Sequence, residues 1–165
     1  MPETVQPGSR TLRLCAAVLG ALIGVTAVAA PARAEGGAVT EYPVTTAADS
    51  IPSGLTSGPD RALWFTENAA GRIGRIALDG TVTDFPTSGP DTGPTAITQG
   101  PDRALWFTET RANRIGRINS SGRLTEFPVP TAGSGPAGIA LGPDRAVWFT
   151  ELIGNAIGRV RSLRG

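Results

Sequence analysis

The chain has 165 residues, with 15 Lys and Arg against 14 Asp and Glu, no His, and a net charge of +1. There is no Lys, and the single Cys, Cys15, lies in an N-terminal apolar stretch. These counts exclude an imidazole base, a Schiff-base lysine and a zinc or haem site built on His and Cys. The Arg residues are scattered, so the basic footprint of a nucleic-acid-binding protein is absent, and we expect no nucleic-acid partner.

Residues 1–34 predict a signal peptide. Two Arg precede the apolar stretch 14–30, and residues 32–34, Ala-Arg-Ala, have the small-x-small form of a signal-peptidase site. The alternative is an uncleaved anchor, since about 17 apolar residues are near the lower limit for a membrane span. Pro31 and the Ala-x-Ala site favour cleavage after Ala34. We therefore expect a secreted or extracytoplasmic protein without a stable membrane span after cleavage.

One ten-residue phrase recurs at a period of 42 residues: GPDRALWFTE at 58–67 and 100–109, and GPDRAVWFTE at 142–151. Three shorter elements recur with it, each separated from the next by Gly, Pro, Asp or Asn. They are the Ile-Gly-Arg runs at 71–76, 113–118 and 155–160, the Thr-acid-aromatic-Pro runs at 40–43, 83–86 and 125–128, and the runs after Pro52, Pro94 and Pro136 with Leu55, Ile97 and Ile139. Four strand-like runs per 42 residues predict one four-stranded β-propeller blade per repeat.

We therefore expect residues 35–165 to form a partial all-β propeller of three four-stranded blades, with an N-terminal strand at 39–43 and repeats at about 44–86, 87–128 and 129–165. Propellers have roughly four to eight blades, so three cannot close around an axis. We expect an open crescent as a single chain. A homodimer in which each N-terminal strand finishes the partner's last blade would close a six-bladed ring. The alternative is a shortened relative, or truncated relic, that stays open.

The repeated phrase predicts a strand buried on both faces. Leu63 and Phe65 alternate with Trp64 and Thr66, as expected for a blade packed between two others. The preceding Pro59-Asp60 is turn chemistry, and Arg61 follows where a Gly would accept a positive φ more easily. Either another turn type is used or the Arg accepts some strain.

Glu67, Glu109 and Glu151 end the three repeated strands and are the candidate ligand or metal residues. In one interpretation, each pairs with the Arg eight residues later, Arg75, Arg117 or Arg159. In the other, the three carboxylates point toward one rim and bind a divalent cation through oxygen. Equal spacing favours the structural interpretation, because a catalytic site usually breaks repeat symmetry.

Taken together, the runs G-P-D-x-A-[LV]-W-F-T-E, I-G-R-I, T-E-F-P and P-x-x-I resemble the virginiamycin B lyase (streptogramin lyase) family of seven-bladed propellers. The resemblance covers nearly all of residues 35–165. It implies a Mg²⁺-assisted elimination that opens a cyclic depsipeptide antibiotic at its ester without consuming water. It also implies a His after the Pro of the P-x-x-I run, with a nearby Glu, for base and metal work.

This sequence departs from the family where that chemistry would lie. The positions after the repeat prolines are Ser53, Thr95 and Ala137, so no catalytic residue can be assigned. Two functions follow as expectations. One is a secreted lyase-like protein acting on a cyclic depsipeptide or lactone, with Mg²⁺ as the cofactor that the resemblance implies. The alternative is a non-catalytic secreted module that binds a peptide, glycan or protein, or else a truncated relic without a function of its own.

Overall fold

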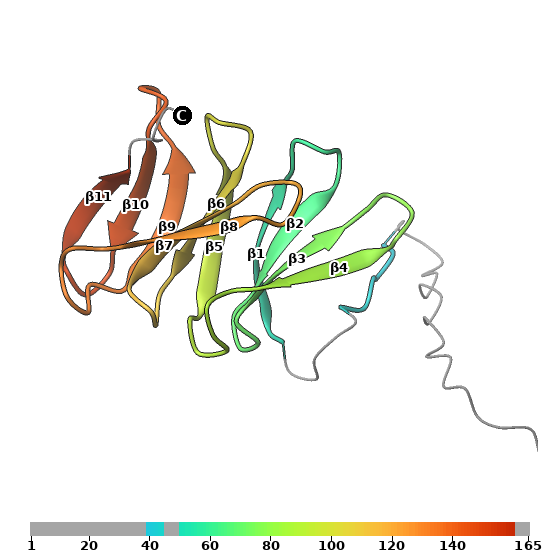
Figure 1. The fold of residues 1–165 in the computed structure, drawn as a ribbon, viewed down its shortest axis with the longest axis horizontal. Helices are drawn as coiled ribbons and strands as arrows, with labels where there is room; N and C mark the ends of the chain where they lie inside the picture. The colour runs from blue at the N-terminus through green and yellow to red at the C-terminus, as the bar shows by residue number, and fades with distance from the viewer. Residues whose placement is uncertain (1–38, 45–49, 161–165) are drawn as a thin grey trace, which may run out of the picture. The chain divides into compact units, whose positions relative to one another are not determined.

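The computed structural model describes residues 39–44 and 50–160, which belong to one compact unit, Pro31–Gly165. The predicted signal peptide, residues 1–34, lies outside the described residues. Within these described ranges, every regular element is a β-strand (Figure 1). The described residues contain no helix long and apolar enough to cross a membrane.

The strands form three consecutive antiparallel sheets, which we call blades 1, 2 and 3. Blade 1 contains β1 (Pro52–Ser57), β2 (Leu63–Glu67), β3 (Arg72–Ile76) and β4 (Val82–Pro86). Blade 2 contains β5 (Pro94–Gln99), β6 (Leu105–Glu109), β7 (Arg114–Ile118) and β8 (Leu124–Pro128). Blade 3 contains β9 (Pro136–Leu141), β10 (Val147–Glu151) and β11 (Ala156–Val160).

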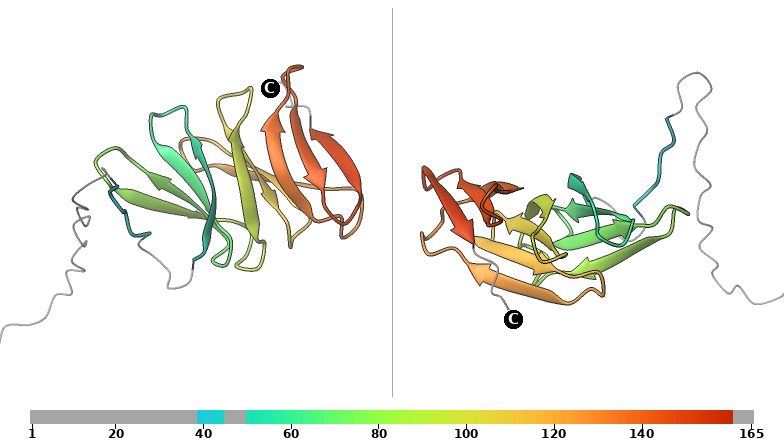
Figure 2. Two further views of the ribbon diagram at one scale, coloured as in Figure 1. Left: turned by 180° about the vertical axis from the view of Figure 1, so that it is seen from behind. Right: turned by 90° about the horizontal axis from the view of Figure 1, so that it is seen from above.

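Each blade is a meander in which sequence neighbours pair, and the three blades lie side by side in both views of Figure 2. Blades 1 and 2 have four strands, whereas the described part of blade 3 has three, with β11 at its edge. The sheets remain separate from one another. The prediction of propeller blades in an open array is therefore confirmed for the single chain.

The repeated phrase forms the turn between the first two strands and then the second strand. Asp60 Oδ1 accepts hydrogen bonds from the Ala62 backbone N–H at 3.4 Å and from Trp64 Nε1 at 3.0 Å. Arg61 has φ +60°, and its two repeats have nearly the same value. The Arg thus accepts the left-handed conformation that Gly would adopt without cost.

The predicted pairing of each Glu with the Arg eight residues later is wrong. Arg75 Nε donates to Asp60 Oδ2 at 2.6 Å, and Arg117 and Arg159 pair in the same way with Asp102 and Asp144. The register explains this result: Arg75 lies opposite Trp64, on the face that Asp60 also reaches, whereas Glu67 lies opposite Arg72.

The second strand of each blade contributes to two cores. Trp64 packs with Ile97, Leu105 and Phe107 of blade 2, and Trp106 packs with Val147 and Phe149 of blade 3. The Trp therefore faces the following blade and the Phe faces the preceding one. A Cβ at Gly74 would lie only 2.1 Å from Phe65 Cζ, so the Gly in each Ile-Gly-Arg run leaves room for the Phe ring.

Hydrogen bonds also join neighbouring blades at their second strands. Thr66 Oγ1 donates to the Thr95 carbonyl at 2.8 Å, and Thr108 Oγ1 donates to the Ala137 carbonyl at 2.8 Å. Both Thr side chains are buried. Each junction between blades thus combines apolar packing with a satisfied buried hydroxyl.

Residues 39–44 contain a single bridge residue, Thr40, and Tyr42 lies near Gly80 in the β3–β4 turn. Phe85 of β4 lies in the same way against Gly122 in the β7–β8 turn of the next blade. Tyr42 therefore contacts blade 1 as the aromatic residue of a preceding fourth strand would.

Candidate functional site

The candidate site lies at one edge of the blades, which we call the loop edge. It consists of the second-to-third-strand turns, 68–71, 110–113 and 152–155, and the linkers that precede each first strand, 87–93 and 129–135. Backbone hydrogen bonds hold turn and linker together: Thr110 N–H donates to Gly93 O and Leu152 N–H donates to Gly135 O, both at 3.0 Å. The arrangement places loops from successive blades beside the start of each first strand.

The positions where the resemblance implies a His are at this edge. Ser53 is exposed, whereas Thr95 and Ala137 are half-buried near the starts of β5 and β9. The Thr95 hydroxyl is within 2.8 Å of Thr110 Oγ1 and 3.0 Å of Gly93 O, and it accepts from Asn68 Nδ2 at 3.1 Å. Its hydrogen-bonding capacity is used by the junction, so it is not poised to activate a ligand.

Polar residues that the sequence did not single out surround Thr95. Arg111 Nη1 donates to Asn68 Oδ1 at 2.9 Å and its Nη2 donates to Asn68 O at 2.6 Å. These residues break the repeat: Asn68, Thr110 and Leu152 occupy equivalent positions with different chemistry. That loss of symmetry, inside otherwise repeated segments, was the signal that could have identified them.

Glu67, Glu109 and Glu151 lie under the loop edge and are buried. Within the described residues, both carboxylate oxygens of Glu67 and of Glu109, and Oε2 of Glu151, have no hydrogen-bond partner of good geometry. For Glu67 and Glu109, burial raises the pKa, because it penalises the charged form.

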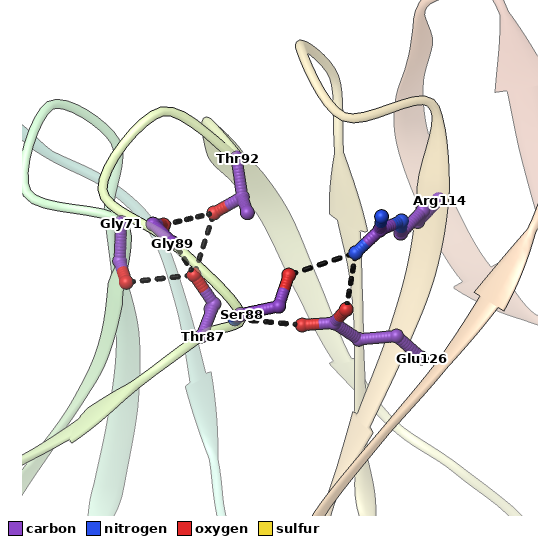
Figure 3. A network of polar contacts seen from close by, with 7 residues as sticks. All are labelled: Gly71, Thr87, Ser88, Gly89, Thr92, Arg114 and Glu126. Carbon is purple, nitrogen blue, oxygen red and sulfur yellow. Dashed lines mark hydrogen bonds and ion pairs between the residues drawn. The ribbon is translucent and has the colours of Figure 1, made fainter.

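A polar cluster links Ser88, in the linker after blade 1, to Arg114 and Glu126 of blade 2 (Figure 3). Arg114 and Glu126 also act electrostatically on the buried Glu109. Arg114 Nη1 pairs with Glu126 Oε2 at 2.6 Å and donates to Ser88 Oγ at 2.7 Å, and Glu126 Oε1 accepts from the Ser88 N–H at 2.9 Å. The pKa of Glu109 is raised from its ordinary value of 4.5 to about 7, mainly by burial and then by the Glu126 carboxylate, while Arg114 and Thr92 oppose the shift. The neutral, protonated form of Glu109 is therefore favoured relative to a solvent-exposed Glu.

The other two blades contain variants of this cluster. In blade 1, burial first and the Asp84 carboxylate second raise the pKa of Glu67, and Arg72 lies 3.7 Å from Asp84. In blade 3, Ala156 lies opposite Glu151, at the position that Arg72 and Arg114 occupy in blades 1 and 2. All three blades thus have a Glu at this position, but only blades 1 and 2 have an Arg opposite it.

Among the described residues, no group of three or more His, Cys, Asp or Glu side chains could hold a metal ion. Glu67, Glu109 and Glu151 each lie within their own blade, and at blade 2 the Arg114 guanidinium already neutralises Glu126. The structure therefore does not bring the three candidate carboxylates together.

A shallow pocket opens beside this cluster. Its volume is about 270 Å³, and it is lined by Ser88, Gly89, Pro90, Asp91, Thr92, Ala112 and Arg114. Thr87 Oγ1 and Thr92 Oγ1, 2.6 Å apart, fix the linker that forms its wall (Figure 3). The pocket offers a guanidinium and a hydroxyl, which are donors suited to carbonyl and ester oxygens.

Comparisons with solved structures agree with this architecture. Crystal structures of a selenomethionine-substituted virginiamycin B lyase from Staphylococcus aureus, and of its catalytically inactive histidine-to-alanine variant with quinupristin, are each 47% identical. Each matches with a TM-score of 0.73 over 75% of this chain and 42% of that one. A streptogramin B lyase structure is 44% identical, with a TM-score of 0.71 over 73% of this chain and 40% of that one.

A more distant match shows the fold alone. A gluconolactonase from Xanthomonas campestris is 19% identical, with a TM-score of 0.54 over 63% of this chain and 36% of that one. The chain spans less than half the length of the lyases that it matches.

The sequence profile of the Virginiamycin B lyase family matches residues 30–164, which include all three blades and the loop edge between them. This match and the identity of nearly one half to solved lyases agree with the resemblance found in the repeated motifs. The chain belongs to the Virginiamycin B lyase family.

Proposed function

We propose that this chain is an exported, lyase-like propeller protein that binds a cyclic depsipeptide of the streptogramin type at its loop edge without opening the ring itself. One observation carries the proposal. The chain has no His, and a family member that is inactive through loss of a His was crystallised with quinupristin. That protein was thus obtained with a ligand although it lacks this imidazole, and this chain has no imidazole at all.

The loop edge supports binding of such a ligand. Arg114 and Ser88 in the pocket can donate to the carbonyl and ester oxygens of a depsipeptide. Leu152 and Ile153 in the next turn are exposed apolar side chains. Apolar surface with a few convergent polar groups is the usual composition of a small-molecule site.

The same geometry argues against turnover by these residues. Opening the ring by elimination needs a base in contact with the ligand. Glu109 has a suitable pKa of about 7, but its side chain is fully buried under the linker. The Glu109 carboxyl group is thus not accessible to a ligand bound at the surface of the loop edge.

Titration of the purified chain with quinupristin, with and without Mg²⁺, tests the proposal. We expect saturable binding by calorimetry and, by chromatography, no opened ring. Elimination would leave the ligand mass unchanged but shift its retention, whereas hydrolysis would add the mass of one water. Ring opening above the uncatalysed rate would overturn the proposal that the chain binds without catalysis. Absence of saturable binding would overturn the proposal that the ligand is a streptogramin-type depsipeptide.

A matched pair of variants locates the site. Replacing Leu152 and Ile153 together by Ser should weaken binding about tenfold, because apolar area is lost from the proposed contact. Leu78→Ser is the control, since Leu78 is exposed but lies in the β3–β4 turn, away from the loop edge. If the Leu78 variant weakened binding as much as the double variant, the ligand site would not be at the loop edge.

Export is part of the same proposal and has its own test. Cleavage after Ala34 gives a protein that begins at Glu35. The intact mass of the protein recovered outside the cell should match that start. A mass that retains residues 14–30 would instead support the membrane anchor.

A further inference from the structure

The two ends of the blade array expose the same surfaces that its internal junctions bury. From this we propose that a second copy of the chain docks head to tail, with its blade 1 against blade 3 of the first copy and its Val39–Pro43 segment paired to β11. This proposal concerns association and does not depend on the ligand of the previous section.

The outward face of blade 3 is not packed against a following blade, whereas the equivalent faces of blades 1 and 2 are. Ile157 is 64% exposed, although the equivalent Ile73 and Ile115 are 0% and 1% exposed. Thr150 is exposed, whereas Thr66 and Thr108 are fully buried and donate to the next blade. These side chains are in the positions that a following blade would cover.

The outward face of blade 1 is the complementary surface. Leu55 is 63% exposed and Leu63 is 39% exposed, whereas the equivalent Ile97 and Leu105 of blade 2 are 8% and 0% exposed. Ile97 and Leu105 pack with Trp64 and Ile73 at the first junction. Leu55 and Leu63 can therefore pack with Trp148 and Ile157 of another copy by the same contacts.

Trp148 shows what is missing at the open end. Trp64 stacks on Phe85 with ring centroids 5.3 Å apart, and Trp106 stacks on Phe127 at 5.6 Å. Among the described residues, no aromatic ring stacks on Trp148, and the Arg159 guanidinium lies 5.2 Å from its ring centroid. In the part of the chain that the structure describes, Trp148 therefore lacks the stacked aromatic residue that β4 and β8 provide in blades 1 and 2.

Val39–Pro43 has the sequence of that fourth strand. Thr40-Glu41-Tyr42-Pro43 matches the runs that end β4 and β8, and Tyr42 already contacts Gly80 as Phe85 contacts Gly122. In blade 1, Ile73 is paired with Phe85. The same register places Tyr42 of the second copy opposite Ile157, on the face that also carries Trp148.

One contact makes the new junction weaker than the internal ones. By the same register, the docked strand brings Glu41 to the position of Asp84 and Glu126. Ala156 replaces the Arg that balances those acids, so Glu41 would face the buried Glu151 without a guanidinium.

Two copies that each dock on the other in this way form a closed pair. Such a pair has six blades, within the range of roughly four to eight in closed propellers.

Light scattering after size exclusion, over a range of concentrations of the purified chain, tests the proposal. We expect twice the chain mass at high concentration. Ile157→Glu should give a monomer, because Ile157 is exposed in one copy and buried only in the junction. Tyr42→Ala should shift the dimer to at least tenfold higher concentration.

Leu78→Glu is the matched control. Leu78 is 83% exposed, and its repeat position in blade 2, Ser120, is exposed although blade 2 has neighbours on both sides. A monomer at every concentration, or a dimer that survives Ile157→Glu, would overturn the docking. Masses that grow beyond two copies and are abolished by Ile157→Glu would support the head-to-tail contact and overturn the closed pair.

Discussion

Blades 2 and 3 have the same ten-residue phrase with one change, Leu105 to Val147, yet their Trp residues are in different environments. Trp106 is buried, stacks on Phe127 and packs against blade 3. Trp148 makes the same hydrogen bond to its Asp but remains partly exposed, with a guanidinium over its ring. The local sequence thus determines the turn and the strand, and the neighbouring blade determines burial.

The largest expected effect comes from truncating the two Trp residues. Trp106→Ala should lower the free energy of unfolding by about 3–5 kcal/mol, since it leaves a cavity between two blades. Trp148→Ala should cost clearly less, because its ring already faces solvent. Urea unfolding followed by circular dichroism, in dilute protein so that copies stay apart, measures both. Equal losses would contradict the idea that burial depends on the following blade.

A second comparison concerns how the raised pKa values of Glu109 in blade 2 and Glu67 in blade 1 make stability depend on pH. Glu109 has a pKa of about 7 in the folded chain, above its ordinary value of 4.5, so the folded state binds more protons between these values. Stability should therefore fall as pH rises through this window, by on the order of 2–3 kcal/mol from this group. Glu109→Gln should remove most of that slope and stabilise the chain above about pH 7.

Glu67→Gln is the control for that experiment. Burial and Asp84 also raise the pKa of Glu67, so its removal should act in the same direction but by less. Chemical unfolding at a series of pH values separates the two. A slope that is unchanged in Glu109→Gln would show that the pH dependence arises elsewhere.

The smallest expected effect comes from the junction hydroxyls. Thr108→Val removes the donor to Ala137 O and the acceptor for the Ala96 N–H, and should cost about 1–2 kcal/mol. Thr150→Val loses only the contact with the Gly138 N–H at an exposed position, so a smaller loss is expected. Thermal unfolding of dilute samples compares them, and a larger effect at Thr150 would reverse the expected order.

Much of the fold was predictable because the strands and turns of a blade are determined by residues that are close together in the sequence. The 42-residue period, the Pro-Asp turn and the alternation of Trp and Phe determine four short strands and their order without reference to distant residues. The sequence also showed that no His stands after the repeat prolines, which decides that Ser53, Thr95 and Ala137 cannot act as bases in that position.

Only the tertiary structure decided which charges meet. Arg75 and Arg72 both lie near Glu67 along the chain, but strand register places Arg75 beside Asp60 and Arg72 opposite Glu67. The pKa of Glu109 likewise depends on burial under a linker and on Glu126, 17 positions away in the sequence. Charge pairing and desolvation depend on distances through space, and these are determined only when strands pair and blades pack.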